Sequence, residues 1–324
     1  MDLSNYLKTA LDAALRAGDA ILQIYARDFE VEFKADNSPL TEADKAAHHI
    51  ICDALEDTCL PILSEESQTI IYDKRKDWSI YWLVDPLDGT KEFIKKNGEF
   101  TVNIALIENG RPVLGVVFAP VLGFVYCGML DVQDGTSEAW KAVGCAEKSV
   151  DEVLSSSVSL SFDLSKRSGD PDASERSPTS DLGTLSSDLR PPSSAIRVVA
   201  SRSHCNDETK AFIAGLEKQG RVELVSSGSS LKLCLVAEGR ADIYPRIAPT
   251  MEWDTAAAQA VVEAAGGCVV QYDPAVPAAS YLTQGSECIE QSEASPHAPC
   301  PRLHALRYNK ANLLNPYFVV ARKD

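Results

Sequence analysis

The chain of 324 residues is long enough for one large or two medium-sized domains, and its 45% apolar and 24% charged content is ordinary for a globular protein. Its formal net charge of −16 argues against a broad surface for nucleic acid or anionic membrane, although a bound metal could still attract an anionic substrate locally. The nine cysteines form no CxxC pair, no apolar run is long enough to cross a bilayer, and the N-terminus does not look like a leader, so we expect free thiols, no transmembrane segment and a cytoplasmic location.

The first sixty residues predict two helices separated by a short strand. Apolar residues from 4 to 25 recur at helical spacing and form one apolar face. Residues 31–33 alternate apolar and charged side chains like a strand, and a turn-rich loop follows at 34–39. The sequence Thr41-Glu42-Ala43-Asp44 has the form of a helix-capping box, which places Asp44 in the first turn of the second helix. Capping alone would explain Asp44.

Two acidic motifs follow apolar runs that are typical of strands. Residues 60–63 predict a buried strand ending at Ser64-Glu65-Glu66, and this strand would aim Glu65 at a fixed point. The run 81–84 leads into Asp85-Pro86-Leu87-Asp88-Gly89-Thr90, where we expect the strand to end and the backbone to turn sharply. Carboxylates three residues apart diverge in an extended chain. Here the fixed φ of Pro86 and the freedom of Gly89 let both acids converge.

Converging carboxylates repel one another unless cations lie between them, and hard oxygen ligands select Mg²⁺ or a similar ion. Thr90 places a hydroxyl beside this cluster. A short helix predicted from residue 91 would offer the N–H groups of Gly89 and Thr90 to a phosphate. The segment therefore predicts a divalent-metal phosphatase site.

The composition of the chain divides it into three parts. Strands predicted at 101–107, 113–117, 123–127 and 135–140, with a hairpin turn at Glu108-Asn109-Gly110, complete an α+β domain over residues 1–146 that contains the metal site. Residues 147–195 are rich in Ser, Pro and charged residues and predict a disordered insertion. Residues 196–324 form an α/β domain that carries the substrate-binding residues and an irregular insertion at about 275–305.

The last part alternates predicted strands and helices. A strand at 241–244 leads to Arg246, and an apolar helix opens at Trp253-Asp254 and closes at Gly266-Gly267. N-capping of that helix would by itself explain Asp254. The sequence contains no P-loop, dinucleotide, zinc-protease or serine-hydrolase motif, which weakens those classes of enzyme.

Three motifs in chain order resemble the inositol monophosphatase superfamily of lithium-sensitive, Mg²⁺-dependent phosphatases. They are Glu65-Glu66, Asp85-x-x-Asp88-Gly89-Thr90 and Trp253-Asp254-x-Ala256-Ala257. Further segments are similar to the CysQ branch, whose members are 3'(2'),5'-bisphosphate nucleotidases. These segments lie at 34–39, 63–66, 81–84, 88–107, 201–204 (SRSH), 228–232 (GSSLK), 235–239 (LVAEG) and 308–316 (YNKANLLNP). The similarity covers about 5–145, 196–272 and 306–320, and it fails in the Ser-rich stretch and in the segment before Leu306.

The resemblance implies an α/β protein, with an α+β first half and an α/β second half, folded as a layered α-β-α-β-α sandwich. It also implies two or three Mg²⁺ ions per site. Glu65, Asp85 and the carbonyl of Leu87 would hold the first, while Asp85, Asp88 and Asp254 would hold the second. Asp44 and Thr90 match the positions that orient and deprotonate the attacking water. The implied substrate contacts are Glu65, Leu87, Asp88, Gly89, Thr90, His204, Ser229, Lys232, Arg246 and Asp254.

Ser229, Lys232 and Arg246, with His204 nearby, would face the 5'-phosphate or the adenosine. A surface position or a local ion pair is the alternative explanation for Lys232 and Arg246. The implied reaction removes the 3'-phosphate of 3'-phosphoadenosine 5'-phosphate and gives AMP and phosphate, which links the enzyme to sulfate assimilation and sulfotransfer. Its partner would be this small nucleotide bisphosphate and no nucleic acid polymer.

Two other functions stay open. The first is hydrolysis of inositol or sugar phosphates on the same metal site. The first half of the chain is compatible with both this activity and the nucleotidase, and only the GSSLK and Arg246 region distinguishes them. The second is an inactive metal- or nucleotide-binding regulator that uses the Ser-rich insertion as an interaction segment. The sequence leaves the oligomeric state open.

Overall fold

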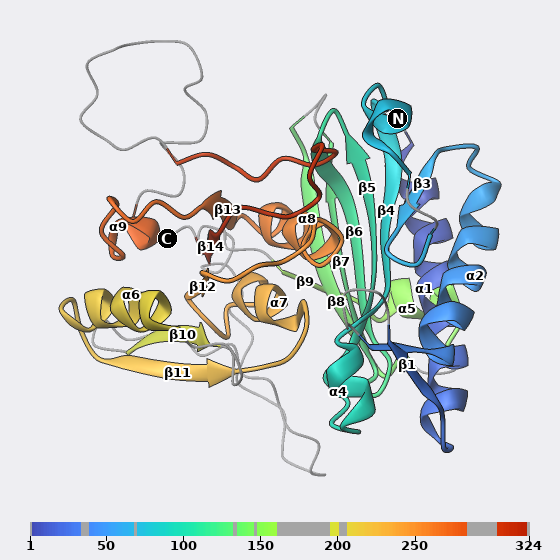
Figure 1. Ribbon diagram of the computed structural model, residues 1–324, viewed down its shortest axis with the longest axis horizontal. Coiled ribbons are helices and arrows are strands. Elements are labelled where there is room, and N and C mark those ends of the chain that lie inside the picture. The colour runs from blue at the N-terminus through green and yellow to red at the C-terminus, as the bar shows by residue number, and fades with distance from the viewer. Residues whose placement is uncertain are drawn as a thin grey trace, which may run out of the picture.

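Helices and sheets alternate in layers through the molecule (Figure 1). The computed structural model describes residues 2–33, 39–67, 70–131, 135–145, 148–160, 195–200, 206–283 and 303–322. From the N-terminal side the layers are α1 with α2, a seven-stranded sheet, α7 with α8, a five-stranded sheet, and α6. The predicted α-β-α-β-α sandwich is confirmed.

The outer helical layer forms where the sequence predicted it. Helices α1 (Leu3–Tyr25) and α2 (Glu42–Glu56) pack against each other and cover one face of the first sheet. Leu7, Leu11 and Ile21 of α1 are buried because they recur on its apolar face. A complete capping box between Thr41 and Asp44 starts α2.

The first sheet has the order β3-β4-β5-β6-β7-β8-β9, and only the β3–β4 pair is parallel. Its strands are β3 (Ile62–Ser64), β4 (Ile80–Asp88), β5 (Thr101–Glu108), β6 (Arg111–Ala119), β7 (Phe124–Leu130), β8 (Ser137–Val143) and β9 (Val158–Ser159). The predicted hairpin turn at Asn109 and Gly110 joins β5 to β6. Smaller elements of this half are β1 (Val31–Phe33), β2 (Pro39–Thr41), α3 (Tyr72–Arg75) and α4 (Thr90–Ile94).

The second sheet has the order β11-β10-β12-β14-β13 and mixes parallel and antiparallel pairs. Its strands are β10 (Ile196–Ala200), β11 (Val222–Ser226), β12 (Ile243–Arg246), β13 (Cys268–Gln271) and β14 (Phe318–Ala321). Helices α6 (Asp207–Glu217) and α9 (Ser280–Thr283) pack on its outer side.

The central helical layer lies between the two sheets, and one of its helices approaches the first sheet very closely. This layer contains α7 (Leu231–Ala237) and α8 (Ala256–Ala264). A Cβ added at Gly115 of β6 would lie 2.0 Å from the carbonyl oxygen of Ala257, and one added at Gly128 of β7 would lie 2.6 Å from the Cα of Val261. These glycines let the backbone of α8 lie directly on β6 and β7, so the second half of the chain is fixed to the first sheet.

The predicted boundaries of the two insertions need correction. Helix α5 (Val150–Ser155) begins with a capping box between Ser149 and Glu152, and β9 pairs with β8, so regular structure continues past the predicted start at 147. Val153 is fully buried in the first core, which explains why this part is ordered. Helix α9 likewise falls inside the predicted irregular stretch at 275–305. Residues 161–194 and 284–302 lie outside the described residues, and the rest of the domain division stays a prediction.

No helix in the described part of the chain is long and apolar enough to cross a bilayer.

Candidate active site

Strand β4 brings Asp85 and Asp88 to the same side of the first sheet. The strand does not end after Val84, as predicted, but pairs with β5 as far as Asp88. Asp85 faces Asn103 and Asp88 faces Thr101, so three steps along β4 match two steps along β5. This extra residue is a β-bulge, and it turns two side chains that would otherwise point to opposite faces toward one face. The predicted convergence is therefore correct, whereas the predicted strand end is wrong.

The bend that follows uses Gly89, whose φ of 96° lies in the left-handed region that glycine adopts at little cost. Helix α4 then begins at Thr90, close to its predicted start.

Asp254 completes a cluster of three acids. Asp85, Asp88 and Asp254 each offer a carboxylate oxygen, and these oxygens lie within 4.8 Å of one another. Asp254 comes from the loop before α8, so the cluster forms where the two halves of the chain meet. Its Oδ2 accepts the Met251 N–H at 2.8 Å, while the N-cap of α8 is Thr255, whose side chain makes no capping bond. The helix-capping explanation for Asp254 is therefore wrong.

Burial and nearby negative charge raise the pKa values of Asp85 and Asp254. Burial is the main cause of the raised pKa of Asp85, followed by the charges of Glu65, Asp88 and Asp254. Burial also raises the pKa of Asp254, with the charge of Asp88 next. Buried oxygen ligands that repel one another are stabilised by a hard divalent cation, so this set fits Mg²⁺ by its chemistry.

Glu65 and Leu87 lie beside this cluster. The Glu65 N–H donates to the Val84 carbonyl at 3.1 Å, which fixes the end of β3 against β4, although Glu65 is not one of the three converging acids. The Leu87 N–H donates to Asp85 Oδ1 at 3.1 Å, and Leu87 itself is buried. The structure thus brings both predicted residues near Asp85, and their role as ligands stays a prediction.

Asp44 both caps α2 and contacts Thr90. Its Oδ2 accepts hydrogen bonds from the Thr41 N–H at 2.7 Å and the Thr41 hydroxyl at 2.6 Å. Its Oδ1 accepts from the Thr90 hydroxyl at 3.3 Å, and that hydroxyl also lies 3.5 Å from the Leu87 carbonyl. Burial is the main cause of the raised pKa of Asp44. Capping and a place in the site are therefore compatible, because the two carboxylate oxygens have different partners.

One oxygen of Asp88 is held by three donors. The Ser229 hydroxyl lies 2.7 Å from Oδ2, the Ser230 N–H 2.6 Å and the Asn103 amide 3.4 Å. The Thr101 hydroxyl lies 2.7 Å from that of Ser229 and 2.8 Å from that of Ser230. These bonds converge on Oδ2 and fix the orientation of the Asp88 carboxylate. Ser229 thus contacts a candidate metal ligand, while its predicted contact with the nucleotide stays a prediction.

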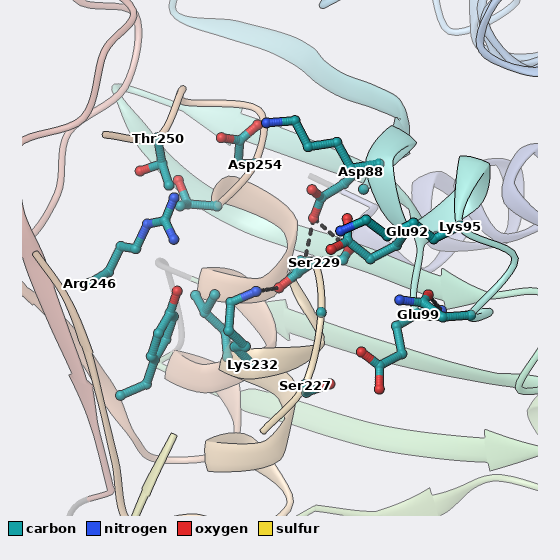
Figure 2. A pocket seen from close by; sticks show the side chains of 18 of the residues that line it. Asp88, Glu92, Lys95, Glu99, Ser227, Ser229, Lys232, Arg246, Thr250 and Asp254 are labelled. Carbon is teal, nitrogen blue, oxygen red and sulfur yellow. Dashed lines mark hydrogen bonds between the residues drawn. The ribbon is translucent and has the colours of Figure 1, made fainter. Parts of the chain in front are cut away.

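A cavity of about 680 Å³ adjoins the acids, and predicted residues from both halves line it (Figure 2). They are Asp88, Gly89, Ser229, Lys232, Arg246 and Asp254. Lys232 is 8% exposed, its Nζ donates to the Ser229 carbonyl at 2.7 Å, and burial lowers its pKa to about 8. Arg246 donates through Nη2 to the Pro249 carbonyl at 2.8 Å, and its buried Nε has no hydrogen-bond partner among the described residues.

The sequence reasoning missed two cations and one polar network. Lys91 and Lys95 line the same cavity, and their four-residue spacing on a predicted helix after the DGT motif was an available signal. Asn103, Thr101 and Ser230 gave no such signal, because their partners lie between 15 and 142 residues away in the chain. His204 lies outside the described residues, so its predicted role has no structural test.

Comparison with known proteins identifies the relatives of this chain. The model of the inositol monophosphatase family matches residues 2–300. This chain belongs to that family. The CysQ 3'(2'),5'-bisphosphate nucleotidase of Escherichia coli K12 is 44% identical over 260 residues, which cover 79% of this chain and 86% of the relative.

Solved structures agree with this assignment. The structure of CysQ from Bacteroides thetaiotaomicron is 42% identical, with a TM-score of 0.70 and coverage of 99% of this chain and 98% of that chain. The SuhB protein of Bartonella henselae, at 22% identity, a TM-score of 0.55 and coverage of 82% and 87%, shares the fold. The predicted family and its CysQ branch are therefore confirmed.

Proposed function

We propose that this inositol monophosphatase family member hydrolyses the 3'-phosphate of 3'-phosphoadenosine 5'-phosphate and releases AMP and phosphate. Its membership of the CysQ branch supports a nucleotidase rather than an inositol phosphatase. The observation that carries the proposal is the position of the three-acid cluster at one end of a cavity lined by Lys232 and Arg246. The cavity volume of about 680 Å³ lies in the usual range for small-molecule sites.

Magnesium is the proposed cofactor, with two or three ions per site. The proposed ligands are Glu65, Asp85, the Leu87 carbonyl, Asp88 and Asp254. When bound, Mg²⁺ would neutralise the acids and stabilise the charge on the transferring phosphoryl oxygens. The all-oxygen set and the raised pKa values of Asp85 and Asp254 support this choice.

Thr90 and Asp44 are the proposed catalytic residues. The Thr90 hydroxyl can donate its single proton to Asp44 and still accept a hydrogen bond from a water that attacks the phosphorus. As the water attacks, Thr90 would take one proton from it and pass its own hydroxyl proton to Asp44, whose raised pKa suits a proton acceptor. Its second oxygen is held by Thr41, so the carboxylate keeps one orientation.

Fixed positive charge in the cavity supports a substrate with two phosphates. Lys232 is buried and Arg246 is half-buried, and both line the cavity. Lys91 of α4 and Lys95, which follows that helix, line it as well. Four cations and four acids line the cavity, and two of the acids, Asp88 and Asp254, are proposed metal ligands. With Mg²⁺ bound to these two, the four cations would favour a strongly anionic ligand. An inositol monophosphate has no second phosphate for them. The sulfated analogue of the nucleotide is a second candidate substrate.

The deciding experiment measures phosphate release from 3'-phosphoadenosine 5'-phosphate, inositol 1-phosphate and fructose 1,6-bisphosphate, with Mg²⁺ and with Mg²⁺ plus Li⁺. Preference for the nucleotide, with inhibition by Li⁺, would support both the branch function and the metal mechanism. Preference for inositol phosphate would be compatible with the proposed metal site and would reject the proposed specificity for the nucleotide. No release from any of the three would favour the inactive regulator.

Two variants test the metal assignment. Asp88→Asn and Asp254→Asn should abolish turnover and keep the circular dichroism spectrum of the wild type, because each change removes one anionic ligand and preserves side-chain size. Near-normal turnover in either variant would reject the proposed ligands.

The proposed compartment is the cytoplasm. The six cysteines in the described residues are free thiols, which is typical of a reducing compartment. Fractionation of cells with antibody detection would test this proposal.

A further inference from the structure

The C-terminal YNKANLLNP motif lies outside the cavity but against the loop that carries Asp254. Its residues 309–315, red in Figure 1, contact residues 250–255, and none of them lines the cavity. The preceding Tyr308 N–H donates to the Gly110 carbonyl at 3.1 Å, so the segment also contacts the turn between β5 and β6. The motif therefore has a position that the proposed chemistry does not yet explain.

Asn315 fixes the two peptide units on either side of Met251. The Asn315 N–H donates to the Thr250 carbonyl at 2.8 Å, and the N–H of the same peptide unit, that of Met251, donates to Asp254 Oδ2 at 2.8 Å. In the next unit, the Met251 carbonyl accepts from the Asn315 side-chain amide at 2.8 Å. A rigid peptide plane transmits this orientation. The direction of the Asp254 carboxylate is thus coupled to Asn315.

A second contact of Asn315 lies on the other side of Asp254. Its side-chain amide is 2.9 Å from the Thr255 hydroxyl, and Asn315 is 4% exposed. The Glu252 N–H donates to the Leu313 carbonyl at 2.9 Å, which is a further bond between the C-terminal segment and the loop before Asp254. Residues 313–315 therefore hold the loop both before and after Asp254.

A buried acid anchors the other end of the segment. Glu252 is fully buried and accepts from the Asn309 N–H at 2.7 Å, the Lys310 N–H at 3.1 Å and the Lys310 Nζ at 2.6 Å. Arg75, which is 2% exposed, donates to the Asn309 side-chain oxygen at 2.8 Å and to the Ala311 carbonyl at 3.2 Å. Lys310 is half-buried, and its charge and the two backbone N–H groups together satisfy the buried Glu252 carboxylate. The segment is thus fixed to the first half of the chain as well as to the Asp254 loop.

We propose that Asn315 is a positioning residue that holds Asp254 in the orientation needed for a divalent cation. The inference rests on the proposed metal role of Asp254. Hydrogen-bond partners that orient metal ligands typically change metal affinity by 10- to 100-fold when they are removed. Loss of the Asn315 side chain removes its bonds to the Met251 carbonyl and to the Thr255 hydroxyl, on the two sides of Asp254. The backbone bond from Asn315 to Thr250 and every proposed ligand stay in place.

The test is calorimetric titration of the full chain with Mg²⁺ alone, without substrate. Asn315→Ala should weaken Mg²⁺ binding by roughly tenfold or more. Asn312→Ala is the matched control, because this exposed side chain accepts the Leu314 N–H and has no hydrogen bond to residues 250–255, which the structure describes. It should change the affinity less than twofold. Asn315→Asp keeps the size and the backbone N–H but removes the side-chain donor, and it should weaken binding as Asn315→Ala does.

A second readout separates positioning from general stability. Turnover of Asn315→Ala should recover when Mg²⁺ is raised, with the substrate KM at saturating Mg²⁺ close to that of the wild type. A lower melting temperature in EDTA with unchanged Mg²⁺ affinity would overturn the proposal, as would equal weakening in the Asn312 control. If the wild type binds Mg²⁺ but does not hydrolyse the nucleotide, the proposed substrate fails while this inference can still hold. A wild type that does not bind Mg²⁺ would overturn both.

Discussion

Replacing Lys232 by Met should stabilise the metal-free protein at neutral pH and weaken its action on a bisphosphate. Lys232 is 8% exposed and forms no ion pair with any described carboxylate, so burial lowers its pKa from 10.5 to about 8. Each pKa unit corresponds to about 1.4 kcal/mol, so the charged amine costs the folded state roughly 3 kcal/mol at pH 7. Loss of the bond to Ser229 removes about 1 kcal/mol, while Met fills a similar volume. The net gain should be about 1–2 kcal/mol.

The pH dependence of this gain has a definite sign. The folded pKa lies below the unfolded one, so the full cost applies below pH 8, where both states are protonated. It disappears above about pH 10.5, where both are neutral. Urea unfolding in EDTA at pH 7 and pH 10.5 measures the difference, and the exposed Lys218→Met is the control. A Lys232→Met variant that is less stable at pH 7, or equally stabilised at both pH values, would refute the reasoning.

The same variant should lose more kcat/KM on the bisphosphate than on a nucleoside monophosphate. The loss should be about tenfold or more, since one fixed cation is removed from the second phosphate. Equal losses on both substrates would contradict the proposed role of Lys232.

Thr90→Val should lower kcat by about a hundredfold, because it removes the hydroxyl that contacts Asp44, and it should change Mg²⁺ affinity much less, because its one contact with a proposed ligand is the 3.5 Å approach to the Leu87 carbonyl. Gly128→Ala should destabilise the protein by about 1–3 kcal/mol in urea unfolding, since the new Cβ would lie 2.6 Å from the backbone of α8, whereas Gly220→Ala, with no atom within 4 Å, should have little effect. Mg²⁺ should raise the melting temperature more at pH 9 than at pH 6. Asp85 has a pKa raised in the fold, so metal-free stability falls as pH rises through that value, and Mg²⁺ competes with the proton.

Local patterns predicted most of the secondary structure. The helical spacing of apolar residues gave α1, the Thr41 capping box gave the start of α2, and the Asn109-Gly110 turn gave the β5–β6 hairpin. Each of these signals lies within a few residues of the element that it specifies. The layered arrangement of the elements came from the resemblance to the family, since periodicity alone does not say which face covers which.

The strand that carries the site was harder to predict. The apolar run of β4 ends at Val84, and the polar residues that follow look like a turn. The backbone nevertheless continues to pair with Asn103 and Thr101 of β5, and the bulge between Asp85 and Asp88 brings both acids to one face. Pairing with a distant strand leaves no trace in the local pattern.

Long-range hydrogen bonds were beyond reach of the sequence for the same reason. Ser230 holds Asp88 across 142 positions, and Asn315 holds Met251 across 64 positions. The YNKANLLNP motif marked Asn315 as part of the resemblance, but no spacing rule connects it with Asp254. Residue type showed which side chains could take part, and only the fold showed which partners they have.

The boundary between the halves explains why the candidate site needs both of them. The predicted domain division placed the metal site in residues 1–146, although the resemblance already named Asp254, from the second half, as a ligand, and its carboxylate oxygen lies within 4.8 Å of those of Asp85 and Asp88. The close contact of α8 with Gly115 and Gly128 fixes where that loop begins relative to the first sheet. Ser229, just before α7, lies where the two halves meet, and its hydroxyl donates a hydrogen bond to Asp88. A change that moved α8 by even one atomic diameter would therefore disturb the acids and the cavity together, because the same packing positions both.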